Sequence, residues 1–262
     1  MAARSIWNGT ITFGLVNVPI KLFTATESKT VHFREVCARD GARIEHRRIC
    51  PKEDKEVPYD EIVKGYEISE GKYVVLEKDE IKAAAGDRGK VVHLTEFVDA
   101  AAIDPVLFEK TYYVGSGGDD DAYGLLLHAL QRTGRAGIGR FAFHDREYLV
   151  AVRAREDVLA LHTLRFHDEV VAIDDLDLGG GSGRKPSNRE VAMAERLIES
   201  LDEPFDPESF EDTFREAVLD LIERKAKGEE IDLAAQEEPA HGDDLLAALQ
   251  ASLGATKKGA KA

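Results

Sequence analysis

The feature that most constrains the fold is a change in hydrophobic period along the chain. Up to about residue 166, apolar and polar residues alternate in short runs, which is the period of a strand with one buried face. After residue 187 the apolar residues recur every three or four positions, which is the period of an amphipathic helix. The sequence therefore predicts a β part followed by a helical part, and its apolar content of 43% is enough for a buried core.

The N-terminal run shows the alternation most clearly. Apolar residues fall on odd positions from 7 to 15 and on even positions from 16 to 22. The change of phase beside Gly14 predicts a bulge or a sharp bend, as at the corner of a barrel. Further strands are expected at 31–36, 73–76, 91–98, 111–114, 138–143, 148–153 and 158–166. The last three are joined by short connections, which predicts an antiparallel meander.

Two helices interrupt the strands. A short one is expected at 79–85, and a longer one at 121–133 has one apolar face and a terminating Gly134. The glycine-rich stretch 179–186 then predicts a flexible linker. Together these features predict an α+β protein.

The helical part has its own start signals. Ser187 and Glu190 have the spacing of a capping box. Asp206 and Pro207 resemble an N-cap and a first-turn proline, and they predict a second helix that runs to Gly228. The predicted organisation is a core at 1–178, a linker at 179–186, a helical arm at 187–231 and a C-terminal extension at 232–262, with a short amphipathic helix and a basic tag.

The net charge of −15 is spread unevenly. Residues 166–254 hold 8 basic and 24 acidic side chains, whereas residues 1–52 hold 9 basic and 4 acidic ones. At physiological salt, exposed charges more than about 8 Å apart are largely screened, so a ligand responds to the local surface. The acidic total therefore does not exclude a polyanionic partner near the N-terminal part.

No motif in the sequence indicates an enzyme or a cofactor. Gly137, Gly139 and Ala142 fit a dinucleotide fingerprint, but they precede a β-rich run where that motif must open a helix. Nucleophile-elbow and zincin motifs are absent, and no carboxylate group has the spacing of a metal site. Cys37 and Cys50 lack a Cys-x-x-Cys pair, which favours two free thiols over zinc.

Several blocks of the sequence resemble one family. The start, RSIWNGTITFGLVNVPIKLF, resembles bacterial Ku proteins, the DNA-end-binding factors of non-homologous end joining. The similarity continues through EIVKGYEISEGKYVVLEKDEI, FVDAAAIDPVLFEKTYYVG, YGLLLHALQRTGRAGIGRFAFHDREYLVAVRA and LIESLDEPFDPESFEDTFREAVLDLIERKAKGEEI. These blocks follow the family order from about residue 4 to residue 231.

The resemblance implies a homodimeric ring made of an antiparallel β-barrel core, arch-forming insertions and a helical arm. It implies binding to the ends of double-stranded DNA without sequence specificity, end protection, and recruitment of the ATP-dependent DNA ligase D. No catalysis, cofactor or metal is implied. Relatives with a Cys-Pro-x-Cys could hold zinc, but Cys50-Pro51-Lys52-Glu53 lacks the second thiol.

Within the matched blocks, charge and placement indicate the candidate DNA-binding residues: Arg34, Arg43, Arg47, Arg48, Arg132, Arg135 and Arg140, with Lys257, Lys258 and Lys261 in the basic tail. That tail is shorter than in many relatives, which should weaken any tail-dependent DNA bridging. The candidate dimer interface is the apolar stripe Phe210, Phe214, Val218, Leu221 and Ile222, which could equally be intramolecular core. The candidate ligase-binding residues are Leu245, Leu246, Leu249 and Leu253.

Two other functions remain open from the sequence. An acidic protein-interaction scaffold that does not bind DNA would explain the charge of −15 directly. A metal-dependent nuclease is less well supported, because the carboxylates lack a matched spacing. The apolar stretches are too short to cross a bilayer and the start does not resemble a signal peptide, so we expect a cytoplasmic, nucleoid-associated protein without a membrane partner.

Overall fold

The computed structural model describes residues 4–85, 90–143, 146–178 and 185–229. The chain divides into two compact units, one made of residues 1–29 and 34–176, the other of residues 30–33 and 177–262. The first unit holds a β-barrel and the arch segment, by which we mean residues 34–76. The described part of the second unit holds two helices.

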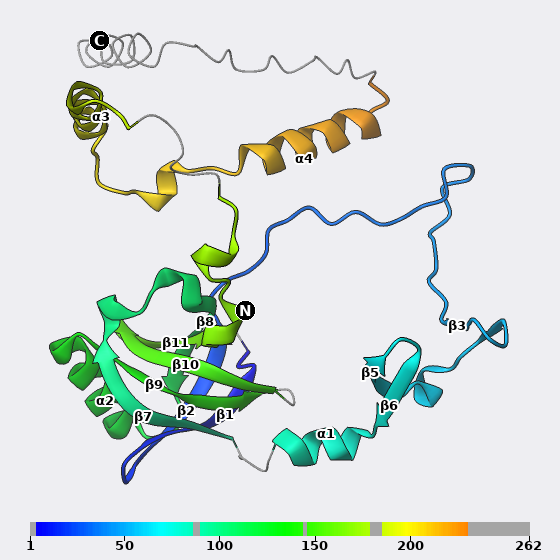
Figure 1. Cartoon of the computed structure of the whole chain (residues 1–262), viewed down its shortest axis with the longest axis horizontal. Coiled ribbons are helices and arrows are strands. Elements are labelled where there is room, and N and C mark those ends of the chain that lie inside the picture. The colour runs from blue at the N-terminus through cyan, green and yellow to red at the C-terminus, as the bar shows by residue number, and fades with distance from the viewer. Residues whose placement is uncertain (1–3, 86–89, 144–145, 179–184, 230–262) are drawn as a thin grey trace. The chain divides into compact units, whose positions relative to one another are not determined.

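A closed barrel of seven strands forms the centre of the first unit (Figure 1). In spatial order the strands are β1 (Trp7–Phe13), β2 (Val16–Thr24), β8 (Phe108–Ser116), β11 (Val158–Leu164), β10 (Arg146–Arg155), β9 (Arg135–Phe143) and β7 (Val91–Asp99). β1 and β7 close the barrel in parallel, and every other pair is antiparallel. The predicted barrel and the antiparallel meander of its last three strands are confirmed, and the one departure from an antiparallel barrel is the parallel closure between β1 and β7.

The phase change beside Gly14 has a different cause from the one predicted. Gly14 has a φ of 55° in the turn between β1 and β2, and Phe13 pairs with Val16 across that turn. Every later pair joins an odd position to an even one, such as Ile11 to Val18. Paired residues point to the same face of a sheet, so a tight hairpin must reverse the parity. The predicted bulge was wrong, and the sharp bend is the turn of a hairpin rather than a corner within one strand.

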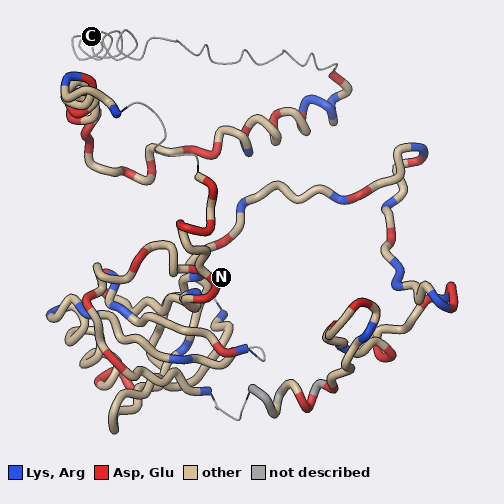
Figure 2. Tube along the Cα trace, in the orientation of Figure 1, with Lys and Arg blue, Asp and Glu red and all other residues tan. Residues whose placement is uncertain are grey.

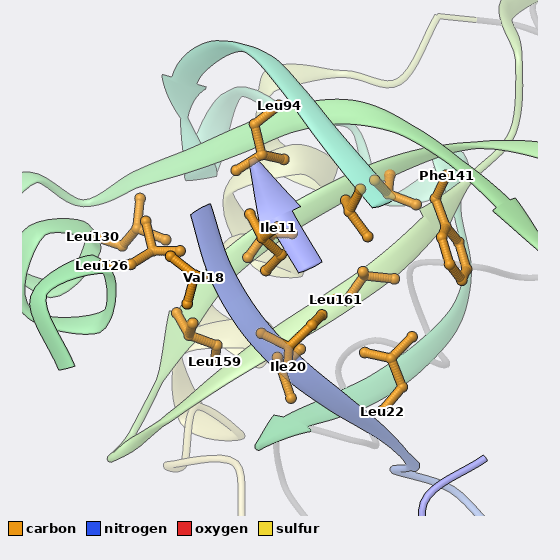
Figure 3. Close-up of a cluster of buried hydrophobic side chains, with 14 of the residues drawn as sticks. Ile11, Val18, Ile20, Leu22, Leu94, Leu126, Leu130, Phe141, Leu159 and Leu161 are labelled. Atoms are coloured by element: carbon orange, nitrogen blue, oxygen red, sulfur yellow. The ribbon is translucent and has the colours of Figure 1, made fainter. Parts of the chain in front are cut away.

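The core is the interior of this barrel, where side chains from all seven of its strands and from one helix meet. Figure 3 shows part of this cluster. Ile11, Val150 and Leu161 are completely buried, and Phe141 makes an edge contact with Trp7 at a centroid separation of 4.9 Å. Burying side chains of this size contributes about 1.5–3 kcal/mol each. This buried apolar surface is therefore the main contribution to the stability of the barrel.

Helix α2 (Asp120–Thr133) packs on the barrel through Leu126, Leu127 and Leu130. Its Tyr123 hydroxyl donates to the Val114 carbonyl at 2.6 Å and accepts from the Leu159 amide at 2.9 Å. The hydroxyl therefore ties α2 to β8 and β11. The predicted helix and its left-handed glycine cap after Thr133 are confirmed.

The arch segment has short secondary structure and no buried residue. Its elements are β3 (Ile49–Cys50), β4 (Lys55–Glu56), the 3-10 turn η1 (Tyr59–Glu61), β5 (Lys64–Ser69) and β6 (Lys72–Leu76), followed by helix α1 (Lys78–Ala85). Within residues 34–76, Cys37, Cys50 and Val57 are half-buried and all other residues are exposed. The strand predicted at 31–36 is wrong, because the only ladder contact there is an isolated bridge from Val36 to Arg43.

Four further 3-10 turns connect the strands of the barrel and the segment that follows it. They are η2 (Ala100–Ala102), η3 (Pro105–Leu107), η4 (His167–Glu169) and η5 (Ile173–Asp175).

The second unit contains α3 (Asn188–Ser200), the turn η6 (Pro207–Ser209) and α4 (Thr213–Ala226). The predicted capping box is confirmed, because the Glu190 carboxylate accepts from the Ser187 amide at 2.6 Å and the Ser187 hydroxyl accepts from the Glu190 amide at 3.3 Å. None of the described helices is long and apolar enough to span a membrane.

The predicted start of the second helix at Asp206 was wrong. Asp206 does cap, but only the single turn η6, by accepting from the Glu208 amide at 3.0 Å. Asp212 then accepts from the Arg215 amide at 2.9 Å and begins α4. Asp206 and Asp212 can both serve as N-caps, and the helix begins after Asp212. Phe210 therefore lies before α4.

Candidate nucleic-acid interface

The first part of the arch segment doubles back on itself and carries two of the predicted cations. Val36 bridges to Arg43, and the Ile44 amide donates to the Glu35 carbonyl at 3.0 Å. Arg34 and Arg43 thus lie on facing stretches of one loop, and both are exposed. Neither forms an ion pair with a described residue within 4.0 Å.

The next two predicted cations are held loosely. Arg47 lies 3.6 Å from the Glu56 carboxylate, and the Arg48 guanidinium lies 5.2 Å from the centre of the Tyr59 ring. Exposed ion pairs of this kind contribute about 0–1 kcal/mol, so Arg47 can exchange its partner for a phosphate at little cost. The structure therefore leaves both cations available to a ligand.

Arg43 and Arg47 share one open hollow of about 620 Å³. It is lined by Arg43, Ile44, Glu45, His46, Arg47 and Glu56. Basic and acidic residues therefore alternate in this part of the arch segment (Figure 2). Residues 34–52 carry six basic and three acidic side chains, so the first part of the arch segment is locally positive.

The predicted cations near α2 and β9 do not form one cluster. Arg132 lies in the last turn of α2 and Arg135 begins β9, with Gly134 between the two elements. Arg140 lies five residues further along β9, about 17 Å away at the rise of a strand. It is paired with Glu147 at 3.2 Å. Of the three, Arg132 and Arg135 have no ion pair with a described residue.

Two arginines on β10 make stronger candidates than the sequence indicated. On β10 the side chains of Val150 and Val152, at even positions, lie in the core. Arg153 and Arg155 are at odd positions, so both lie on the outer face of the barrel. The Arg153 guanidinium lies 5.7 Å from the centre of the Phe108 ring. The alternation is visible in the sequence, but the aromatic partners on another strand are not.

The Arg155 guanidinium repeats this arrangement over the Tyr113 ring, at 5.9 Å from the ring centre. Phe108 and Tyr113 both belong to β8, which is separated from β10 by β11. The side chains of both arginines therefore extend from β10 across β11 to the rings on β8, on the outer face of the barrel.

A buried histidine supports one of these arginines. His162 on β11 has only 4% of its surface exposed, and its Nε2 accepts a hydrogen bond from Arg153 Nε at 3.0 Å. Burial, with Arg153 and Arg155 nearby, lowers the pKa of His162 to about 4. An imidazole that accepts at Nε2 carries its proton on Nδ1, which then donates to the Thr111 hydroxyl at 2.9 Å.

The candidate dimer residues are exposed rather than buried. Phe210 and Phe214 have 73% and 76% of their surface exposed, and Ile222 has 42%. Val218 and Leu221 are half-buried. Among the described residues of the second unit, no apolar side chain is buried, so this stripe is not an intramolecular core there. Phe210 lies outside the helix that carries the other four.

The remaining predicted site residues lie outside the described residues. These are the ligase-binding candidates Leu245, Leu246, Leu249 and Leu253, and the tail lysines Lys257, Lys258 and Lys261. Cys37 and Cys50 are free, half-buried thiols. The described residues contain no group of three or more His, Cys, Asp or Glu side chains with the geometry of a metal site.

Comparison with known proteins identifies the family. Residues 12–193 match the Ku70/Ku80 beta-barrel domain. The chain is 44% identical to the non-homologous end joining protein Ku of Anaeromyxobacter sp. (strain K), over 98% of this chain and 87% of that one. It is 36% identical to the protein of the same name from Bacillus subtilis (strain 168), over 97% and 83%. The chain therefore belongs to the Ku family, and the predictions of a bacterial Ku and of a non-catalytic protein are confirmed.

Proposed function

We propose that the protein binds the ends of double-stranded DNA and acts in double-strand break repair by non-homologous end joining. The observation that carries this proposal is 44% identity, over 98% of the chain, to a Ku protein named for that pathway. The unpaired and weakly paired arginines of the arch segment and of β10 support it, because phosphate contacts carry most of the affinity of such proteins. Contacts to phosphate carry no sequence information, so any end should be recognised.

The proposal includes a homodimer whose two copies form a ring around the duplex. The exposed stripe of the second unit supports dimerisation, because Phe214 and Ile222 would be covered by a second copy. The apolar residues that the arch segment exposes support a further contact of the same kind. A closed ring would make binding depend on a free end, since a ring cannot pass onto a continuous circle.

The proposal also includes a protein partner and a place in the cell. We infer that Leu245, Leu246, Leu249 and Leu253 engage the ATP-dependent DNA ligase D, and that the three tail lysines add non-specific attraction to DNA. The support is the spacing of an apolar helix face followed by a basic tag. We place the protein in the cytoplasm, on the nucleoid, where broken chromosomal ends arise.

The test compares a linear duplex with a covalently closed circle of the same sequence. We expect a mobility shift of the linear duplex that weakens steeply with salt, because each neutralised phosphate lowers the logarithm of the affinity by about 0.9 per decade of salt. The circle should bind far more weakly. Equal affinity for the two substrates would reject threading from an end.

One observation favours a second candidate, an acidic scaffold that binds basic proteins and not DNA. The segment 166–254 carries 24 acidic and 8 basic side chains. If a folded dimer gave no shift of a short linear duplex even at low salt, the scaffold would replace the end-binding proposal.

A further inference from the structure

Arg153 and Arg155 stand out because each is stacked on an aromatic ring of β8 and has no carboxylate partner among the described residues. On the same barrel, Arg140 pairs with Glu147 at 3.2 Å and Arg146 pairs with Glu169 at 2.9 Å. Neither Arg153 nor Arg155 is within 4.0 Å of a carboxylate oxygen of a described residue. Arg153 is half-buried, and a half-buried charge without a counter-ion is costly, so an anionic ligand would remove that cost. Arg155 is exposed and can reach the same ligand.

The position of Arg153 is fixed from two sides. Its guanidinium lies over the Phe108 ring, and its Nε donates to His162. The Phe108 ring also meets the His162 ring edge-on at a centroid separation of 5.1 Å. These contacts use Nε and one face of the guanidinium, and the two Nη amino groups form no hydrogen bond with a described residue. The Nη groups are therefore free to bind two oxygens of a single phosphate.

The network behind Arg153 contains no competing carboxylate. His162 lies opposite Thr111 on β8 and opposite Ala151 on β10. Glu109 precedes Thr111 by two residues on β8, but its carboxylate accepts from the Thr163 hydroxyl at 3.3 Å. His162 must be neutral to accept from Arg153, and its burial keeps it neutral. The histidine thus holds the arginine without cancelling its charge.

We propose that the outer face of β8, β11 and β10 is a phosphodiester-binding site, in which Arg153 and Arg155 contact the DNA backbone and His162 is a positioning residue for Arg153. The two arginines are separated by two residues of one strand, about 6.6 Å. Along the DNA axis one strand carries a phosphate about every 3.4 Å, so two cations at this separation can contact different phosphates of the same strand. The assignment of DNA as the ligand rests on the proposed function.

The first test removes each cation in the full-length protein. Arg153→Gln and Arg155→Gln should each lower affinity for a linear duplex about five- to tenfold at 0.1 M salt, and should each reduce the salt slope by about 0.9. Arg146→Gln is the matched control, because it removes the same charge from the same strand but from an existing ion pair. It should leave the slope unchanged.

The second test asks whether His162 positions Arg153. His162→Leu removes the acceptor and should reproduce the effect of Arg153→Gln, and the double variant should be no weaker than either single one. His162→Gln places an amide oxygen where Nε2 accepts, so it should keep the wild-type affinity and slope. Arg153→Lys keeps the charge but loses the Nε donor and the forked geometry, and it should still lose affinity.

The results separate this inference from the proposed function. If the wild type binds linear duplex while Arg153→Gln and Arg155→Gln keep its slope, the β10 site is wrong and end binding stands. If the wild type does not bind linear duplex, both are wrong. Should His162→Leu fail to fold, Arg153→Lys decides the positioning role, because this variant alters only the half-buried side chain. Wild-type affinity for that variant would overturn the role.

Discussion

The barrel and the arch segment are parts of one unit of the chain, yet they are stabilised in opposite ways. Every buried apolar residue of the described chain lies in a barrel strand or in α2. The arch segment buries none, and it exposes large side chains such as Tyr66 and Tyr73, with 68% and 60% of their surface accessible. Its hairpins have two strands each, and isolated hairpins are marginally stable in water.

From this difference we infer that the barrel is a scaffold and that the arch segment is a binding surface. A barrel with a closed hydrogen-bond ladder keeps its shape without a partner. The arch segment has cations and apolar groups that no described residue covers, so we expect a bound partner to stabilise it. The second unit resembles the arch segment in this respect, because its exposed stripe also lacks a core.

The largest effect should come from truncating the barrel core. Phe141→Ala removes a ring that contacts Trp7 and Phe143, and we expect a loss of about 3–5 kcal/mol in the free energy of unfolding. Tyr66→Ala in the arch segment should change that free energy by less than about 0.5 kcal/mol. Urea unfolding of both variants measures the contrast. Similar losses would mean that the arch segment has a core of its own.

Acid should weaken the barrel through His162. Its pKa is lowered to about 4 in the folded state, so between about pH 6.5 and pH 4 the unfolded chain binds a proton that the folded chain does not. Stability should therefore fall as the pH falls through that window, by up to about 3 kcal/mol. The measurement is the urea midpoint at pH 7 and at pH 4.5.

His162→Gln is the control, since it cannot titrate. It should show a smaller loss between the two pH values than the wild type. An identical loss in both proteins would mean that other groups set the acid sensitivity of the barrel.

Charge reversal in the arch segment should weaken DNA binding and leave the barrel unaffected. Arg47→Glu with Arg48→Glu removes two exposed cations, and each lost phosphate contact costs about 1.2 kcal/mol of binding free energy at 0.1 M salt. We expect a loss of at least about 2 kcal/mol for linear duplex, with an unchanged dimer by sedimentation. Unchanged affinity would remove both residues from the interface.

The smallest effect should be confined to the second unit. Ser187→Ala removes half of a capping box and should lower the local stability of α3 by about 1 kcal/mol. Faster amide exchange in residues 188–200, with unchanged exchange in the barrel, is the expected result. A matching change in the barrel strands would show that the two units unfold together.

Local chemistry made much of this fold predictable. Alternation identified the barrel strands, Gly134 identified the end of α2, and Ser187 with Glu190 identified the start of α3. The errors arose where two local signals compete, or where the structure depends on which strands pair with each other. Asp206 and Asp212 are both good N-caps, and the parity reversal at Gly14 becomes a hairpin only when β1 and β2 pair.

The candidate site was less predictable than the fold. Charge alone selected Arg140, which the structure neutralises with Glu147. Charge alone did not select Arg153. Its role as a candidate phosphate contact depends on Phe108 and His162, which lie on two other strands. Whether a cation is free or paired is set by contacts between distant segments, and a single sequence does not show those contacts.

Amide hydrogen exchange of the arch segment, with and without DNA, tests the central claim most directly. Residues 34–76 should exchange rapidly in the free protein while the barrel strands stay protected. A linear duplex should slow exchange across the arch segment, and a closed circle of the same sequence should not. Protection of the arch segment in the free protein, or an equal response to both DNA forms, would contradict the account.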